Sequence, residues 1–442
     1  MRDHSNHIQL TREDAVAGVL AAIGPVAPEL ERVPVAESVG RVLARDVTAV
    51  CDMPSSLTCN MDSIALHWSD FEGLADGELP DTSGWTRGVE WQFANTGVAM
   101  PEGFETAIAI ENVEVSDDEQ HVTILEGPSR KFAGTSPVGS RLKRGDVLAS
   151  AGTVITPDVA ATIGGGDVGS VTVVRKPRVA FIPTGNELVP AGVPYDALRA
   201  DSFAARGRNF ETNGILVRGK VEAWGGVYVP FDIVVDERDA IREAIELACE
   251  TADIVVLNAG SSKGSDDWSC EVLEEMGQVI CHQTNHGPGH HSSYAVVNGT
   301  PIVGISGPSG GASFTLDFYL RPVMRTYQGL DPDVPKTPAR LVEPFPAGGH
   351  GPGGKGGPGA GRKPAGEQRP PEQHPAESGK PVFFGIRMVS VAPGADGVLE
   401  ARPVAGRPGS AATASANAFY MMPSGPGIKP PAAGDVIPVE FR

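Results

Sequence analysis

The stretch PRVAFIPTGNEL, residues 177–188, decides the fold predicted for this chain. Its first half is an uninterrupted apolar run, which is typical of a parallel strand buried on both faces. It ends in a Thr-Gly turn that places Thr184, Gly185 and Glu187 at the carboxyl end of the strand. In open α/β sheets the ligand site lies outside the carboxyl ends of the strands. The stretch therefore predicts an α/β domain with its site at this turn.

The residues that follow alternate between helix and strand patterns. ETNGILVRGKVEAWGG and DERDAIREAIELACET are expected to be helices, the second with Asp236 as its cap. DIVVLNAG, QVICH and PIVGIS are expected to be strands, with a helix at about 266–276 after the first of them. GASFTLDFYLRPVMRTY is expected to be the final helix. Strands that alternate with helices indicate a doubly wound α/β domain, over roughly residues 177–328.

The chain on either side of this region predicts three further domains. LTREDAVAGVLAAIGPV should open as an amphipathic helix capped by Thr11, and residues 1–50 with 146–176 are assigned to an N-terminal linker domain. Residues 51–145 carry short strand patterns such as IALHW and TAIAIENVEV, and are assigned to a small inserted β-rich domain. Residues 329–442 are assigned to a C-terminal β domain of barrel-like form.

A Gly- and Pro-rich segment interrupts this last domain at residues 347–380. It contains too few apolar residues to offset the backbone entropy that ordering would cost. We therefore expect a disordered insertion.

Composition excludes several classes of function. The 36 basic and 55 acidic residues give a net charge of -19, which argues against a nucleic-acid binder with clustered Lys and Arg. No apolar run approaches the roughly 18 residues of a membrane helix, and the N-terminal sequence does not resemble a signal peptide. The five cysteines lack CxxC spacing, so neither a disulfide framework nor a zinc ribbon is indicated. We expect a cytoplasmic protein that binds neither nucleic acid nor membrane.

Four Gly- and Ser-rich turns are expected at the carboxyl ends of the α/β strands: PTGNE, NAGSSKGSDD, GPGHHSS and SGPSGG. Such turns expose backbone N–H groups, which suit phosphate or another oxyanion. Glu187, Asp266 and Asp267 would repel an anion directly, but they suit a Mg²⁺ ion that bridges to phosphate. Each carboxylate taken singly could instead be a helix cap.

The stretch NHGPGHHSS, residues 285–293, allows three interpretations. Gly-Pro-Gly marks a turn whatever else it does, so a solvated loop is one of them. A metal site is the second, although it would need a third ligand with correct geometry. The neighbouring turns favour the third, an anion- or substrate-binding loop. The residues expected to line it are Pro288, Gly289, His290, His291 and, from the next turn, Ser306.

Five segments resemble, in order along the chain, the motifs of one known family. NMDSIA resembles an MDGYA turn, NTGVAMPEG a TGAxxPxG turn, and PRVAFIPTGNELVPAG the pattern PxVxxxxTGxEL. ETNG resembles a D/E-S/T-N strand end, and NAGSSKGSDDW a GGxSxGxxD loop. Together these segments resemble the MoeA/gephyrin family of molybdopterin molybdenumtransferases, over nearly the whole chain except the insertion.

The resemblance implies a MoaB/MogA-like α/β domain and a transferase of molybdenum cofactor biosynthesis. Such an enzyme inserts molybdenum from molybdate, or tungsten from tungstate, into adenylated molybdopterin and releases AMP with the help of Mg²⁺. The resemblance also implies a homodimer, with the site between the α/β domain of one subunit and the β domain of the other. Two alternatives remain, a non-catalytic protein that binds or delivers molybdopterin or an oxyanion, and a scaffold that recruits partners through its insertion.

The resemblance also implies particular site residues. Glu187, Asp267 and Asp62 would be catalytic, and Glu187, Asp266 and Asp267 would hold Mg²⁺. The further substrate-binding residues that it implies are Thr96, Glu111, Thr184, Gly185, Glu211, Asn213, Ser262 and Gly264.

This chain departs from the family pattern in three places. His290 and His291 stand in a segment where the family usually has PGKP, so imidazole replaces the expected lysine. Arg141 ends a GSR segment where GED is common, and SGPSGG replaces LPGNP. A protonated histidine can donate two hydrogen bonds but is only partly charged near neutral pH. We expect that the changes to Arg141 and to the two histidines arose together, and that they changed how this chain binds its anionic substrate.

Overall fold

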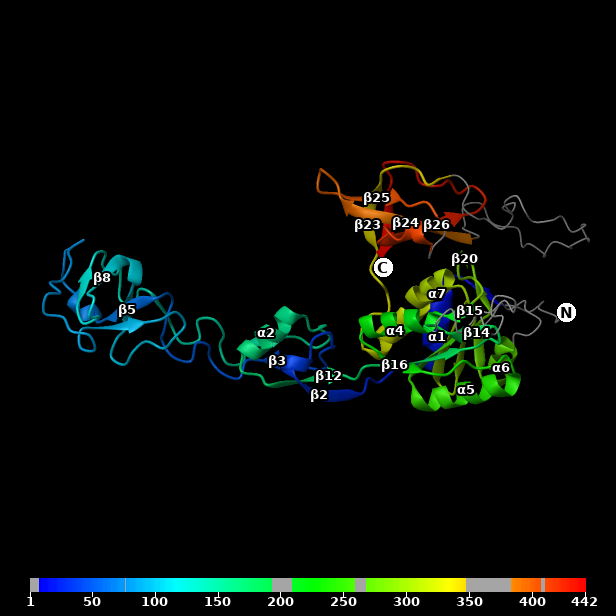
Figure 1. Ribbon diagram of the computed structural model, residues 1–442, viewed down its shortest axis with the longest axis horizontal. Helices are drawn as coiled ribbons and strands as arrows, with labels where there is room; N and C mark the ends of the chain where they lie inside the picture. The colour runs from blue at the N-terminus through cyan, green and yellow to red at the C-terminus, as the bar shows by residue number, and fades with distance from the viewer. Residues whose placement is uncertain (1–7, 76, 193–208, 259–267, 347–382, 407–409) are drawn as a thin grey trace, which may run out of the picture. The chain divides into compact units, whose positions relative to one another are not determined.

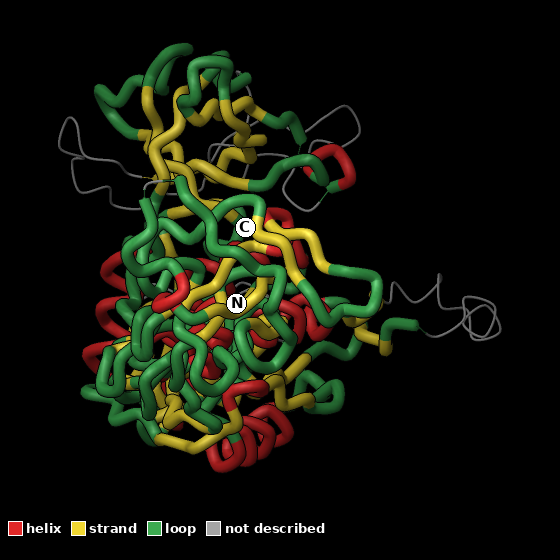
Figure 2. Tube along the Cα trace, turned by 90° about the vertical axis from the view of Figure 1, so that its left-hand side faces the viewer, coloured by secondary structure: helices red, strands yellow, loops and turns green. Residues whose placement is uncertain are grey.

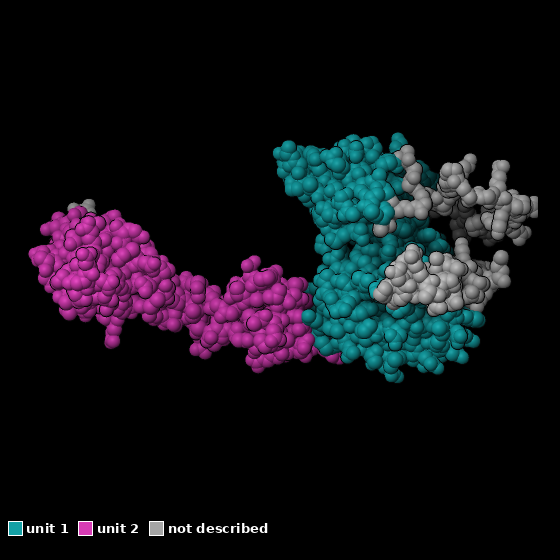
Figure 3. Space-filling model, in the orientation of Figure 1, with its two compact units in different colours: residues 1–28, 175–442 teal, residues 29–174 magenta. Residues whose placement is uncertain are grey.

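The computed structural model describes residues 8–75, 77–192, 209–258, 268–346, 383–406 and 410–442. The chain divides into two compact units, which Figure 3 shows in different colours. The first comprises residues 1–28 and 175–442, and the second comprises residues 29–174. The predicted insertion at 347–380 lies outside the described residues, as does part of the predicted 266–276 helix.

A six-stranded sheet forms the centre of the first unit within the described ranges, in the order β16-β13-β17-β22-β21-β18. Figures 1 and 2 show the helices of this unit packed around its strands. Its parallel strands are β16 (Val227–Pro230), β13 (Arg178–Pro183), β17 (Ile254–Asn258) and β22 (Thr300–Ile305). Val179, Ala180 and Ile182 of β13 are completely buried, because helices cover both faces of the sheet. The predicted doubly wound α/β domain is confirmed.

The other edge of this sheet is antiparallel, which the sequence patterns do not predict. β21 (Tyr294–Val297) runs antiparallel to β22, and β18 (Gln278–Cys281) runs antiparallel to β21. β21 directly follows the histidine loop and turns into β22 through a short connection. Antiparallel neighbours can be joined without a crossover helix. β21 therefore fits directly between the histidine loop and β22, where a strict alternation of strands and helices predicts no strand.

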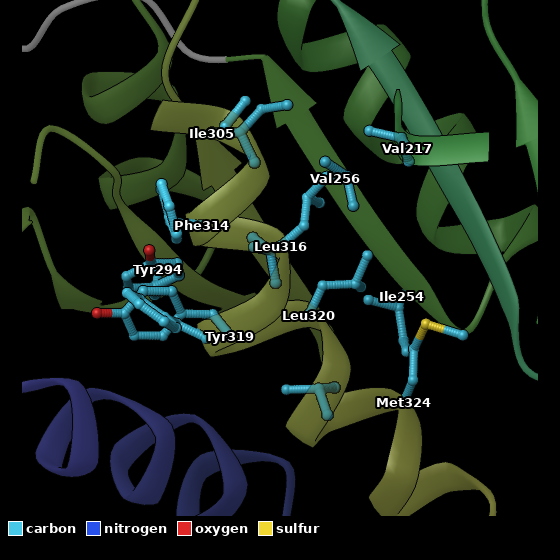
Figure 4. Close-up of a cluster of buried hydrophobic side chains, with 14 of the residues drawn as sticks. Val217, Ile254, Val256, Tyr294, Ile305, Phe314, Leu316, Tyr319, Leu320 and Met324 are labelled. Atoms are coloured by element: carbon cyan, nitrogen blue, oxygen red, sulfur yellow. The ribbon is translucent and has the colours of Figure 1, made fainter. Parts of the chain in front are cut away.

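Helices cover both faces of the sheet. On one face lie α4 (Asn213–Ala223) and a continuous helical segment made of α7 (Ser309–Thr315), the π-helix η5 (Leu316–Leu320) and α8 (Arg321–Tyr327). Figure 4 shows side chains from these helices and from β17 and β22 in one buried cluster. On the opposite face, α5 (Arg238–Thr251) and α6 (Ser269–Met276) pack on Ala180, Ile182 and their neighbours.

The first helix, α1 (Arg12–Ile23), differs from its predicted assignment. Thr11 is its N-cap as predicted, because the side chain accepts a hydrogen bond from the Asp14 N–H. Instead of joining a linker domain, however, α1 packs against β18 and β21 of the α/β sheet, with Ala15 and Val19 in the core. The antiparallel strands have no crossover helix of their own, and α1 covers their exposed face. β1 (Gln9–Leu10) pairs nearby with β19 (Gln283–Thr284).

Asp236 is not the cap of α5, as the sequence pattern suggested. Glu237 occupies the N-cap position and makes no side-chain capping bond. The Asp236 carboxylate instead accepts a hydrogen bond of 3.0 Å from the Asn186 N–H, and its own N–H donates to Asn186 Oδ1 at 3.2 Å. Asp236 therefore holds the turn that carries Glu187.

The C-terminal domain is a closed barrel of five strands among the residues described, as predicted. The strands are β24 (Phe383–Pro393), β25 (Leu399–Pro403), β23 (Thr337–Leu341), β27 (Val436–Phe441) and β26 (Ala418–Ser424). The barrel closes because β24 pairs with both β25 and β26. A short strand of the histidine loop, β20 (His286–Gly287), also pairs with β24, so the loop is hydrogen-bonded to the barrel.

The second unit contains two β-rich parts. In one, β2 (Leu30–Pro34) pairs with β12 (Ser170–Val174), β3 (Val47–Thr48) pairs with β11 (Val147–Ala149), and α2 (Pro157–Gly165) packs beside them. The other has a sheet of three strands within the described residues, β6 (Trp91–Ala94), β5 (Ser63–Leu66) and β7 (Thr106–Ala109). The pairs β4 (Thr58–Cys59) with β10 (Thr135–Ser136) and β8 (Val113–Val115) with β9 (Val122–Ile124) complete it.

In the part of the chain that the structure describes, no helix has the length and apolar character needed to cross a membrane.

Candidate functional site

A buried polar network joins the carboxyl ends of three neighbouring strands. The Thr184 hydroxyl donates to the main-chain oxygen of Asn258 at 2.5 Å, and Asn258 Nδ2 lies 3.4 Å from the Thr184 carbonyl oxygen. Asn213 Nδ2 donates to Asn258 Oδ1 at 3.0 Å and to the Gly307 carbonyl at 2.9 Å. The network brings together the predicted site residues Thr184 and Asn213 with the turn that carries Ser306.

Sequence patterns did not single out Asn258 as a site residue. It is only 6% exposed, and it ends a strand whose other residues are apolar. Its position, a polar residue at the carboxyl end of an otherwise apolar strand, was the signal that could have identified it. A buried amide in such a place is expected to be hydrogen-bonded to other parts of the fold.

The histidine loop and the turn after β22 enclose a pocket of about 310 Å³. It is lined by all five residues that were predicted for this loop, Pro288, Gly289, His290, His291 and Ser306, together with Gly307, Pro308 and Gly311. The rings of His290 and His291 lie side by side, with centroids 3.9 Å apart and planes tilted by 43°. None of these lining residues is acidic. The lining residues therefore include no carboxylate that would repel an anion.

Two glycines allow the backbone to approach closely around this pocket. A Cβ atom at Gly311 would lie 2.5 Å from the Ser306 hydroxyl oxygen, and one at Gly289 would lie 3.0 Å from the Gly311 carbonyl oxygen. Gly289 also has a φ of 96°, which L side chains rarely adopt. The Ser306 hydroxyl oxygen is buried and has no hydrogen-bond partner within the described residues. Ser306 is thus a lining residue of the pocket whose hydroxyl has unused hydrogen-bonding capacity.

His286, the first histidine of the stretch, is a core residue. It is completely buried, and its Nε2 lies 2.8 Å from the Tyr319 hydroxyl. Burial lowers the pKa of His286 to about 3, because the charged imidazolium would lose its hydration. His286 therefore stays neutral at ordinary pH, and its hydrogen bond to Tyr319 anchors the loop to the core.

Glu187 and Glu211 lie outside the histidine pocket. The Glu187 carboxylate is exposed and lies close over Gly185, where a Cβ would be 2.7 Å from Oε2. Glu211 accepts a 2.8 Å hydrogen bond from the Gly214 N–H at the start of α4. It lines a separate pocket of about 370 Å³ that also includes Arg218 and Tyr228. The two predicted carboxylates nevertheless lie on neighbouring segments, because β14 (Leu188–Pro190), which directly follows Glu187, pairs with β15 (Asn209–Glu211).

The three predicted residues of the β domain come together within the second unit. The Thr96 N–H and hydroxyl both donate to Asp62 Oδ1, each at 3.0 Å. These two bonds, the backbone one first, lower the pKa of Asp62 below its ordinary value. Glu111 is exposed in the one-turn helix η3 (Ile110–Asn112), whose first N–H donates to the Asp62 carbonyl oxygen at 2.9 Å. Arg141 is exposed elsewhere in this unit.

Comparison with known proteins identifies the family. A model described as the MoeA N-terminal region, domains I and II, matches residues 10–164. A second model, described as a probable molybdopterin binding domain, matches residues 180–326, which include the histidine pocket and the polar network. The chain belongs to the MoeA family of molybdopterin molybdenumtransferases.

Curated relatives and solved structures agree with the MoeA assignment. The molybdopterin molybdenumtransferase of Haemophilus influenzae is 25% identical over 327 residues, 72% of this chain and 78% of that protein. The Bacillus subtilis enzyme of the same name is 25% identical over 315 residues, 68% of this chain and 71% of its own length. A crystal structure of the molybdopterin biosynthesis MoeA protein from Pyrococcus horikoshii shares the fold, with a TM-score of 0.67 and 20% identity over 98% of this chain and 99% of that one.

Part of the predicted MoeA-type site is not described. Ser262, Gly264, Asp266 and Asp267 lie outside the described residues. Among the side chains that are described, no group of three or more His, Cys, Asp or Glu residues could hold a metal ion. Of the predicted Mg²⁺ ligands, the structure therefore places only Glu187.

Proposed function

We propose that this chain transfers molybdenum from molybdate to adenylated molybdopterin and releases AMP. The observation that carries the proposal is the pocket of His290, His291 and Ser306, which lies within the region matched by the molybdopterin-binding model. Its lining residues include two histidines and a serine, and none of them carries a carboxylate. A tetrahedral dianion such as molybdate or tungstate, which is the substrate, fits this chemistry.

The residues of the pocket would bind and orient the oxyanion. The Ser306 hydroxyl can donate one hydrogen bond, and His290 or His291 can donate a charge-assisted one when protonated. Donors already held in place lower the cost of reorganisation when charge develops on the anion.

Mg²⁺ is the proposed cofactor, and Glu187 would hold it together with Asp266 and Asp267. Mg²⁺ prefers one or two carboxylates and completes its shell with water and substrate oxygens, so one exposed carboxylate on the Thr-Gly turn fits as a ligand. Bound there, the ion would neutralise phosphate charge. The protein's own contribution is to orient Glu187, which it does through the bonds between Asp236 and Asn186.

We also propose a cytoplasmic homodimer in which Asp62, Thr96 and Glu111 complete the site of the partner subunit. The support is the family resemblance and the grouping of these residues at one end of the β5 sheet. Mixing an Asp62→Asn protein with an Asp267→Asn protein should then restore about one intact site per mixed dimer. Failure to restore activity despite demonstrated subunit exchange would contradict the shared site.

A binding or delivery protein of the same fold is the second candidate. The observation that favours it is the pair His290 and His291 in the segment where a lysine was expected, because imidazole carries less positive charge near neutral pH.

One assay separates these functions. The purified protein is incubated with adenylated molybdopterin and either molybdate or tungstate, with and without Mg²⁺, and AMP release is measured. We expect release that requires both the oxyanion and Mg²⁺, and a loss of at least about 10²-fold in Glu187→Gln and in Asp267→Asn. Glu222→Gln, on the exposed face of α4, is the matched control and should retain activity. Tight binding without AMP release would support the delivery protein, and neither binding nor release would contradict both.

A further inference from the structure

We propose that Asn258 is a positioning residue that fixes the floor of the oxyanion pocket through Asn213. This inference rests on the proposed function, because it concerns how the same pocket is built. Neither residue lines the pocket itself. Their effect must therefore pass through the turn at Ser306 and Gly307, which does line it.

The orientation of the two amides is determined by the backbone around them. Asn213 Nδ2 faces the carbonyl oxygens of Ser306 and Gly307, at 3.4 and 2.9 Å, so this side of the amide must be the donor. The same Nδ2 donates to the Asn258 side chain, which must therefore present its Oδ1. That choice turns Asn258 Nδ2 toward the Thr184 carbonyl oxygen, where it acts as a donor. Each amide thus fixes the next one.

Because these hydrogen bonds are buried, the loss of any one of them is costly. Thr184, Asn213 and Asn258 are 5%, 4% and 6% exposed, so water has little access to replace a lost partner. A buried donor or acceptor that loses its partner destabilises the local arrangement more than an exposed one does. The turn at Ser306 and Gly307 therefore has one strongly preferred position while Asn258 is present.

The network also connects the two halves of the proposed site. At one end Thr184 begins the turn that carries Glu187, the proposed Mg²⁺ ligand. At the other end Ser306 and Gly307 line the pocket for the oxyanion. Asn258 lies between them on β17, the central strand, and is hydrogen-bonded toward both sides. Asn258 is thus placed to fix the position of the oxyanion pocket relative to the turn that carries Glu187.

The test compares Asn258→Ala with Val255→Ala. Val255 is buried in the same strand but packs in the apolar cluster on the other face of the sheet, so its truncation weakens the core without touching the network. A displaced turn would hold its hydrogen-bond donors away from the oxyanion, and the loss of one hydrogen bond to a charged ligand weakens binding by about tenfold or more. We therefore expect Asn258→Ala to raise KM for molybdate at least about tenfold, while Val255→Ala leaves it within about twofold.

A double variant checks that the two asparagines act as one unit. Because both belong to the same chain of bonds, Asn213→Ala with Asn258→Ala should raise KM for molybdate no more than the worse of the single variants. Multiplied effects would contradict a shared network. Equal changes in KM for Asn258→Ala and Val255→Ala would reduce Asn258 to an ordinary core residue.

Amide hydrogen exchange gives a readout that does not depend on activity. Exchange in residues 306–311 should become faster in Asn258→Ala and stay unchanged in Val255→Ala, at matched global stability. Unchanged exchange in Asn258→Ala would overturn the positioning role. If the wild-type protein released no AMP, the proposed function would fail, and the exchange pattern alone would still decide whether Asn258 fixes this turn.

Discussion

The carboxylate of Glu440, near the end of the chain, forms a bidentate ion pair with the guanidinium of Arg12, near its start. Arg12 Nη1 and Nη2 lie 2.6 and 3.0 Å from the two carboxylate oxygens, and both side chains are less than one-tenth exposed. The guanidinium also lies over the Phe318 ring, 4.1 Å from its centroid. This pair links helix α1, the α/β domain and the barrel, since Glu440 belongs to β27.

Removal of one partner of this pair should be strongly destabilising. Arg12→Met leaves a buried carboxylate without a counter-charge, and a broken buried pair costs about 3–5 kcal/mol. The double variant Arg12→Met with Glu440→Leu removes both charges, so most of that loss should be recovered. Urea unfolding provides the measurement, and the exposed pair of Arg340 and Asp396 provides the control, since Asp396→Asn should change stability far less. A double variant as unstable as the single one would contradict this account.

Local sequence patterns were sufficient to predict most strands and helices. PRVAFIPTGNEL gave the correct buried strand because its apolar run and its turn are features of neighbouring residues. The position of α1 was not predictable in this way, because its place on β18 and β21 depends on an antiparallel edge about 270 residues further along the chain. Asp236 was taken for a cap because its spacing fits one, but its partner Asn186 lies 50 residues away.

In the candidate site, too, residues adjacent in sequence were predicted correctly, whereas a residue whose partners lie far along the chain was missed. The five residues predicted around the histidine loop do line one pocket, because four of them are adjacent in sequence. Asn258 was missed, since its partners Thr184 and Asn213 are 74 and 45 residues away and only the fold brings them together. Glu211 lines a separate pocket, and it ends the short strand β15, which pairs with β14 in a two-stranded sheet apart from the six-stranded one.

Thr96 should control the acidity of Asp62. The Thr96 N–H and then its hydroxyl lower the pKa of Asp62, so Thr96→Val, which keeps the N–H, should raise that pKa part of the way to its ordinary value. Because the folded pKa is the lower one, any contribution to stability is present above the ordinary pKa and is lost as the pH falls. Carbon NMR titration of the Asp62 carboxyl measures the change. Thr96→Ser keeps both donors and should leave the titration in place, and an unmoved pKa in Thr96→Val would contradict the assignment.

His286 should make the protein sensitive to acid. Its folded pKa of about 3 lies below the ordinary value of about 6.5, so between these values the unfolded chain binds one proton more than the folded one. Stability should therefore fall as the pH drops below about 6.5, with His286 contributing a slope of about 1.4 kcal/mol per pH unit. His286→Gln should remove this part of the slope, as measured by urea unfolding between about pH 6 and 4. Tyr319→Phe removes the hydrogen-bond partner but leaves the imidazole, so it should lower stability and keep the slope.

His290 and His291 should make oxyanion binding depend on pH. They line the pocket with their rings 3.9 Å apart, and a protonated imidazole is a much better donor to molybdate than a neutral one. Affinity for molybdate should therefore weaken as the pH rises through the neutral range and imidazoles lose their protons. His286 cannot produce this effect, because it is already neutral there.

The double variant His290→Gln with His291→Gln keeps hydrogen-bonding groups in the pocket but removes the titratable charge. It should bind molybdate more weakly at about pH 6, by about 1–3 kcal/mol, and its affinity should change little up to about pH 8.5. Calorimetric titration of both proteins with molybdate and with tungstate across this range makes the comparison, and His67→Gln in the second unit serves as a control for the loss of a histidine outside the pocket. Parallel curves for the wild type and the double variant would mean that the two histidines are ordinary loop residues, and the charge in the pocket would then have to come from another group.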